Sequence, residues 1–251
     1  MLGHSLNELE CAMTAGYRSP PIVESVLEFR FASPLDFETI EKRTDKLKRY
    51  YPHRVTQAVE FNAEMSDRGI SGSRHPVGLR FTTPDELQVM MVNVQALAIA
   101  QLAPYPGWDA FRERIKRDIE RYIDSFGRRP ISRIGMRYIN RIDAPAQAVN
   151  VEDYLRVFPS IPHLGGSIGK TFALQVTHQL PDHRFDVTLQ SATVDSPVPN
   201  NLSFLLDIDL FTTVDIPTRD DQIFKLLDEM RVVKNSIFES SITDSARKLF
   251  N

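Results

Sequence analysis

The sequence lacks several features on which common chemistries depend. Its 251 residues include a single cysteine, Cys11, so no internal disulfide can form and no Cys/His spacing suits a zinc site. No apolar stretch approaches the length of about 18 residues that suggests a membrane span, and the N-terminal stretch has no apolar run of a secretory signal. These absences predict a cytoplasmic protein that does not enter a membrane.

The sequence also lacks an excess of charge of either sign. Lys and Arg total 30 against 33 Asp and Glu, which gives a formal net charge of −3. Dedicated nucleic-acid binders and proteins of anionic membrane surfaces usually carry a strong basic field. The balance therefore argues against a nucleic-acid partner.

Catalytic motifs are missing as well. Residues 165–169, GGSIG, carry the letters of G-x-S-x-G but lead into a predicted strand and not into a helix, so no nucleophile elbow is predicted, and no dinucleotide-binding glycine pattern occurs. The stretch 164–171, LGGSIGKT, is similar to a phosphate-binding loop, but Leu164 stands where the pattern requires glycine. A phosphate-binding loop also opens a helix, whereas residues 170–180 alternate like a strand. We therefore predict no catalytic residue and no cofactor, although the absence of motifs alone leaves an enzyme open.

Two small groups of residues have the composition of metal or acid/base sites. His178 and His183 flank a predicted turn at Asp182, and Asp207 and Asp209 share one face of a predicted strand. Neither group has a further ligand nearby in the sequence. The interpretation we favour is polar turn residues for the first group and a solvated or ion-paired couple for the second, so no metal site is predicted.

Alternating and helical patterns predict an α+β fold, mainly antiparallel sheet with helices on one face. We expect strands at 22–31, 57–64, 77–83, 86–93, 95–103, 131–143, 170–180, 183–194 and 201–214. We expect helices opening at Ser33-Pro34, then over 108–126, about 150–158 and about 218–238, with one more turn in the tail.

The order of these elements divides the chain into three segments. Residues 1–19 show no period and are predicted to be a flexible extension. Residues 20–128 form a first β-α-β(4)-α half and residues 129–251 a second β-α-β(3)-α half, packed together as one unit. The similar order of the halves suggests an internal duplication.

Charged residues occupy one face of the leading strand in each half, opposite the apolar face. One interpretation is a solvated sheet face, or cross-strand ion pairs that fix the register. The other is a concave sheet whose arginines grip phosphate or carboxylate through bidentate contacts. The candidate ligand- or partner-binding residues are Glu24, Glu28, Arg30, Arg133, Arg137, Asn140 and Arg141.

The predicted helix 108–126 also carries a basic set of side chains. Acidic residues are interspersed with these arginines and lysines, which is typical of a solvated helix exterior with i,i+4 ion pairs. The basic residues are Arg112, Arg114, Lys116, Arg117 and Arg121.

Three stretches together carry a resemblance: SPPIVESVLEFRF at 19–31, RIGMRYINRID at 133–143 and NSIFESSITDSARKLF at 235–250. The chain resembles, from Pro20 onward, a sporadically distributed bacterial and archaeal family of unknown function. The resemblance implies that Tyr138 and the candidate residues, Arg133 excepted, matter to that family, and it implies no reaction.

Two functions are therefore expected of this sequence. The first is a non-enzymatic binding module that recognises a protein partner or associates with itself. The alternative is a phosphate- or nucleotide-binding protein that uses a charged concave sheet face, with or without a metal ion. The Glu-x-Glu-x-Lys signature of triphosphate tunnel proteins is absent, since only Glu28-Phe29-Arg30 is present.

Overall fold

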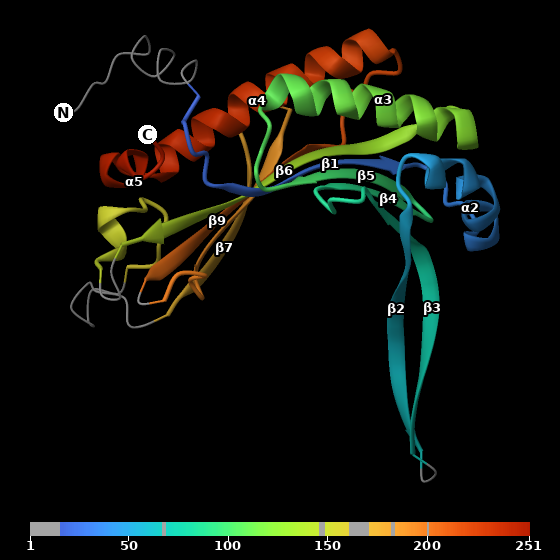
Figure 1. Ribbon diagram of the computed structural model, residues 1–251, viewed down its shortest axis with the longest axis horizontal. Helices are drawn as coiled ribbons and strands as arrows, with labels where there is room; N and C mark the ends of the chain where they lie inside the picture. Colours follow the sequence, from blue (N-terminus) through green and yellow to red (C-terminus); the bar gives the residue numbers. More distant parts are fainter. Residues whose placement is uncertain (1–15, 67–68, 146–148, 161–170, 182–183, 200) are drawn as a thin grey trace. The chain divides into compact units, whose positions relative to one another are not determined.

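A computed structural model describes residues 16–66, 69–145, 149–160, 171–181, 184–199 and 201–251, with the side chains of 59–74 left outside the description (Figure 1). The elements, in chain order and with η for a 3-10 helix, are β1 (Ile22–Phe31), α2 (Phe37–Arg43), η1 (Thr44–Arg49), β2 (His53–Ser66), β3 (Gly69–Thr82), β4 (Gln88–Asn93), β5 (Ala96–Leu102), α3 (Trp108–Phe126), β6 (Ile131–Ala144), η2 (Val151–Asp153), β7 (Ala173–Gln179), β8 (Asp186–Val194), β9 (Leu202–Thr212), α4 (Asp220–Ser241) and α5 (Asp244–Lys248).

The strands form one antiparallel sheet in the order β2-β3-β4-β5-β1-β6-β9-β8-β7. The predicted α+β fold with a mainly antiparallel sheet is therefore confirmed. Consecutive strands joined by short turns pair as neighbours, as expected for such connections. No helix in the described ranges is long and apolar enough to cross a membrane.

Two compact units make up the chain. Residues 26–134 form one, which we call the central unit. Residues 135–251 form the other together with the N-terminal 25 residues, of which 16–25 are described, and we call it the terminal unit.

In the central unit, α3 lies along one face of the strands (Figure 1). The buried side of α3 includes Trp108, Phe111, Ile115 and Tyr122, spaced three and four residues apart, which is the stripe that a helix needs to cover a sheet. Gly78 of β3 is a position of close approach, because a Cβ there would lie 2.0 Å from Oδ1 of Asn93. Only glycine fits without a shift of the neighbouring strand.

In the terminal unit, α4 packs against β9. The strand presents Phe204, Leu206, Ile208 and Leu210 on its buried face. The buried stripe of α4 continues from Met230 through Lys234 and Phe238, whereas Val233 and Ile237 are only partly buried. A lysine therefore occupies a core position of this helix.

Some predicted elements differ from the observed ones. The strands expected at 57–64 and 77–83 are longer and pair as one hairpin from His53↔Thr82 to Ser66↔Gly69. The helix expected over 150–158 is a single 3-10 turn, Val151–Asp153, because the chain at Leu155 makes a bridge to Ile242 instead. The expected tail helix is present as α5.

The predicted flexible extension, 1–19, is ordered in its last residues. The Tyr17 hydroxyl donates to Oε1 of Glu239 at 2.7 Å, and its ring lies edge-on to Phe250 at 5.2 Å. Burial and the adjacent carboxylate raise the pKa of Tyr17 well above its usual range. Cys11, the loop 164–170, Asp182 and His183 lie outside the described residues.

Candidate functional site

The alternation of three neighbouring strands places polar side chains on the sheet face of the terminal unit opposite α4. On β6, residues 136, 138, 140 and 142 are buried, and the intervening side chains turn to the other face. On β9, residues 204, 206, 208 and 210 lie on the face under α4. We call the opposite set the polar strand face; it consists of Glu24, Arg137, Arg141, Asp143, Asp207 and Asp209.

Arg137 and Asp207 form the centre of the polar strand face. Arg137 donates from Nε and Nη2 to the Asp207 carboxylate, with the shortest contact at 2.6 Å. The two side chains differ in burial: Arg137 is 45% exposed and Asp207 only 3%. A buried carboxylate thus holds an arginine that remains open to solvent, which is the side-on bidentate geometry of strong Arg–carboxylate pairs.

Three carboxylates act on the guanidinium of Arg137. The hydrogen bonds to Asp207 raise the pKa of Arg137 above its usual value, and the charges of Asp207, Asp209 and Glu24 act in the same direction. Nη1 of Arg137 has no hydrogen-bond partner among the described residues. One edge of this guanidinium is fixed by the protein and the other edge still carries donors.

A second charged group lies farther along β6. Arg141 donates to Asp143 at 3.0 Å, and the Ser203 hydroxyl donates to the same carboxylate at 2.5 Å. Arg137 and Arg141 are four residues apart on one strand, which separates them by about 13 Å. Each guanidinium is held by its own carboxylate, Asp207 for Arg137 and Asp143 for Arg141, so the two arginines form separate groups.

The remaining charged candidates belong to the central unit. Oε1 of Glu28 accepts from Arg30 and from Arg133, both at 2.7 Å. The pair with Arg133 joins β1 to β6 and is the more buried of the two. Such a cross-strand pair fixes register and contributes at most about 1 kcal/mol when partly exposed.

Asn140, the last candidate, lies on the opposite face. It is 3% exposed and donates from Nδ2 to the carbonyl oxygens of Leu206 at 3.0 Å and Tyr138 at 3.3 Å. Its observed contacts tie β6 to β9 within the core. The structure thus brings Arg137 and Arg141 to the polar strand face, near Glu24, and separates Asn140 from them.

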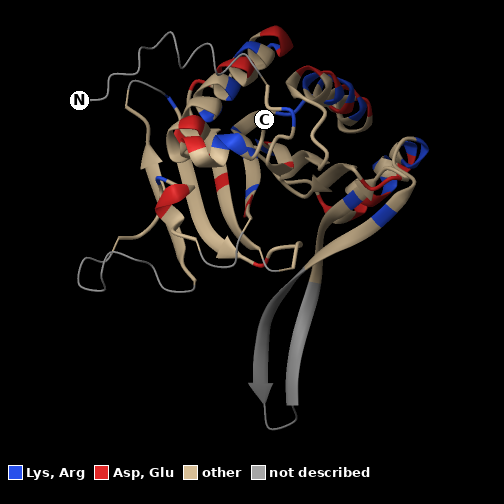
Figure 2. Cartoon of the chain, turned by 60° about the vertical axis from the view of Figure 1, so that its left-hand side comes forward, with Lys and Arg blue, Asp and Glu red and all other residues tan. Residues whose placement is uncertain are grey.

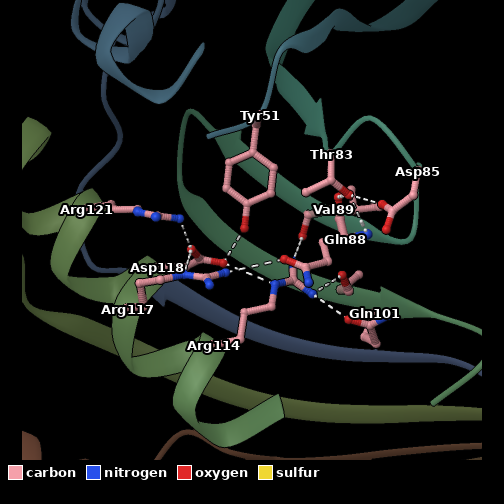
Figure 3. A network of polar contacts seen from close by, with 11 residues as sticks. Tyr51, Thr83, Asp85, Gln88, Val89, Gln101, Arg114, Arg117, Asp118 and Arg121 are labelled. Carbon is pink, nitrogen blue, oxygen red and sulfur yellow. Dashed lines mark hydrogen bonds and ion pairs between the residues drawn. The ribbon is translucent and has the colours of Figure 1, made fainter. Parts of the chain in front are cut away.

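The structure contains a further polar cluster that the sequence pattern did not indicate. Within the central unit, Asp118 of α3 is fully buried and Arg114, one turn earlier, is 5% exposed (Figure 3). Asp118 accepts from the Tyr51 hydroxyl at 2.5 Å, from Arg114 at 3.3 Å and from Arg121 at 2.9 Å. The interpretation of this helix face as a solvated exterior is wrong for Arg114 and Asp118.

Arg114 connects α3 to two neighbouring strands. Nη1 donates to the carbonyl of Ala100 and Nη2 to that of Val89, both at 2.8 Å, and these two residues are register partners on β5 and β4. A planar guanidinium suits this fork-like contact. The buried charges are paired and hydrogen-bonded, so the cluster anchors the helix on the hairpin. Positions 111, 114, 115, 118 and 122 share one helix face, which is the signal that marks it.

The described residues show little that would hold a metal ion. No group of three or more His, Cys, Asp or Glu side chains comes together in the ranges given above. Within each unit, basic and acidic residues are interspersed along the helices (Figure 2). The described helices therefore carry no concentrated basic patch.

Comparisons with known proteins add no family. No protein-family model matches the chain, and no curated protein matches it. The geometry of the polar strand face therefore carries the functional argument alone.

Proposed function

We propose that this chain is a non-enzymatic binding module and that the polar strand face recognises a polar segment of a protein partner. The observation that carries the proposal is the arrangement of Arg137. Its guanidinium is held by the buried Asp207 and directs unpaired donors at Nη1 toward solvent. An arginine fixed in this way loses less side-chain freedom on binding than a mobile one.

The charges around Arg137 favour a neutral or basic partner over a phosphate. The carboxylates of Asp207 and Glu24 act on the same guanidinium, so an incoming phosphate meets negative charge beside Arg137. A backbone carbonyl or a side-chain amide accepts from Nη1 without that repulsion. The distance of about 13 Å between Arg137 and Arg141 also suits an extended segment, because four strand residues span about this length.

The phosphate- or nucleotide-binding alternative has one supporting observation. Arg137 and Arg141 lie on one sheet face and are both partly exposed. Each is already paired with a carboxylate, so phosphate would have to displace Asp207 or Asp143. This competition places the alternative second.

The strand order supports a duplication within the proposed module. In the sheet, β1 lies beside β5 and then come β4 and β3; β6 lies beside β9 and then come β8 and β7. We infer that the halves 20–128 and 129–251 arose from one ancestral unit, and that the chain belongs to the family that its three motifs resemble. A cytoplasmic location is part of the same proposal.

The test combines capture with a direct affinity measurement. Wild type is used as bait in the native cell extract, each captured protein is produced in pure form, and its affinity is measured by isothermal titration calorimetry. Arg137→Ala should weaken binding at least about tenfold, since a hydrogen bond to a charged group contributes about 1.5–3 kcal/mol. Arg219→Ala is the matched control, because Arg219 is 71% exposed and its ion pair is with the nearby Asp221.

Equal affinity of wild type and Arg137→Ala for every captured protein would overturn the proposal. A parallel thermal-shift series uses ATP and inorganic polyphosphate, with and without Mg²⁺. A ligand at about a hundred times its dissociation constant stabilises the native state by about 2.7 kcal/mol. A shift that disappears in Arg137→Ala would favour the phosphate alternative.

A further inference from the structure

Among the described residues, β7 is an edge strand that lacks the features which usually protect such strands. It is the last strand of the sheet order, and its side chains other than Leu174 are exposed on both faces. Its sequence, ALQVTHQ, contains no Lys, Arg, Asp, Glu or Pro. Natural edges are commonly blocked by charge, proline or bulges, and β7 pairs with β8 without a register shift.

The hydrogen-bond pattern identifies which backbone groups of β7 point away from the sheet. Leu180 N–H donates to the Phe185 carbonyl, and Thr193 N–H donates to that of Phe172. Residues 172 and 180 thus pair with 193 and 185, which continues the β7–β8 register at both ends of the strand. Hydrogen-bonded pairs recur at every second residue of an antiparallel ladder, so the even-numbered residues of β7 are the ones that bond to β8. The N–H and C=O groups of the odd-numbered residues, Ala173, Gln175, Thr177 and Gln179, point outward.

Those outward backbone groups have no hydrogen-bond partner in the described part of the chain. Backbone polar groups at an open edge pair readily with another extended strand. We propose that the β7 edge is a self-association surface, on which β7 of a second copy adds in antiparallel orientation about a two-fold axis through Val176. This site is separate from the polar strand face and does not depend on it.

The sequence of β7 is compatible with pairing to itself in this register. Gln175 would oppose Thr177 of the second copy, and Ala173 would oppose Gln179, so all four outward residues meet as hydrogen-bonded pairs. At the even-numbered positions, which form the non-hydrogen-bonded pairs between the two copies, Val176 would oppose Val176 and Leu174 would oppose His178. No like charges meet, which is the usual obstacle to pairing identical strands.

The exposed side chain of Val176 is consistent with a two-fold axis at this residue. Val176 is 47% exposed, and a two-fold pair would cover it against its equivalent. One strand pair buries less surface than the roughly 1,200 Å² of stable interfaces, so we expect a reversible dimer that forms at micromolar concentration. A C2 arrangement closes with a single contact and ends further growth at this edge.

Sedimentation velocity tests the proposal on the full chain from about 1 to about 200 µM, a range that brackets the affinity expected of a small interface. Wild type should pass from monomer to dimer. Val176→Lys and Val176→Glu should each remain monomeric, because like charges then meet on the axis, and an equimolar mixture should dimerise again. Val214→Lys is the control, because Val214 is 53% exposed and lies outside β7.

Two further results distinguish this edge from other modes of association. Gln175→Pro removes an outward N–H without removing a β7–β8 bond, so it should fold and stay monomeric. Amide exchange of Gln175 and Thr177 should slow as protein concentration rises, while that of Val176 and His178 stays constant. A wild type that is monomeric throughout, a mixture of the charged variants that stays monomeric, or a dimer that persists in Gln175→Pro would overturn the proposal.

Discussion

Lys234 is a charged residue in the apolar stripe of α4, and replacing it with methionine should stabilise the protein. The side chain is 6% exposed, and Nζ lies 3.8 Å from the centre of the Tyr138 ring. Burial, and then the charge of Arg231, lower the pKa of Lys234 from 10.5 to about 7, while Glu239 acts in the opposite direction. The folded state therefore disfavours the ammonium form.

The size of the stabilisation follows from the cost of burying the ammonium group and from the cation–π contact that offsets part of it. A lysine pKa lowered to about 7 corresponds to about 5 kcal/mol in favour of the neutral form. The cation–π contact with Tyr138 offsets about 2 kcal/mol of this. Methionine has a similar unbranched shape and no charge, so Lys234→Met should raise the free energy of unfolding by about 3 kcal/mol at pH 6.

The pH dependence gives the sharper test. Between about pH 7 and pH 10.5 the unfolded state binds a proton at Lys234 that the folded state does not, so wild-type stability rises with pH through this window. The slope contributed by one group approaches about 1.4 kcal/mol per pH unit. Lys234→Met lacks this contribution, and its advantage should therefore shrink as the pH rises from 7 to about 10.

Urea unfolding followed by circular dichroism at several pH values measures both effects. Lys225→Met is the matched control, because Lys225 is exposed on the same helix. Its difference from wild type should be small and independent of pH. A Lys234→Met protein that is less stable than wild type at pH 6, or whose advantage does not change with pH, would refute the reasoning.

Three further substitutions test other contacts. Asp118→Ala leaves a buried guanidinium without its counter-charge and should lower the free energy of unfolding by about 3–5 kcal/mol in urea titrations, whereas Asp124→Ala, exposed on the same helix, should change it little. Tyr17→Phe removes the hydrogen bond to Glu239 and should lower the melting temperature, corresponding to about 1 kcal/mol; an unchanged melting temperature would contradict that contact. Gly127 closes α3 with a φ of 75°, so Gly127→Ala should destabilise by about 1 kcal/mol, and an equally stable alanine variant would argue against the strained cap.

The strand pattern of the sequence determined much of the fold. Period-two alternation in 22–31 and 131–143 identified the two leading strands and their buried faces, because neighbouring side chains on a strand point to opposite sides. The three- and four-residue spacing of Trp108, Phe111 and Ile115 likewise identified α3. These features are local, so they can be read without knowing which segments meet.

Pairing partners depended on the tertiary structure. The sequence placed Arg137 on a polar face, but its partner is Asp207, 70 residues away and on a strand that adjoins β6 only in the sheet. The same holds for Asp118, whose contact with Tyr51 joins residues 67 positions apart. Charge patterning along one helix indicates which side chains are polar and cannot say which of them a neighbouring strand will cover.

The sequence by itself therefore determined the α+β class, the leading strands and the main helices, since each follows from periodicity over consecutive residues. Only the tertiary structure decided that Lys234 and Arg114 are buried, that Asn140 serves the core, and that β7 ends the sheet with its outward backbone groups unpaired among the described residues. The physical reason is that burial and hydrogen bonding depend on which distant segments come together. Local sequence limits those encounters and does not specify them.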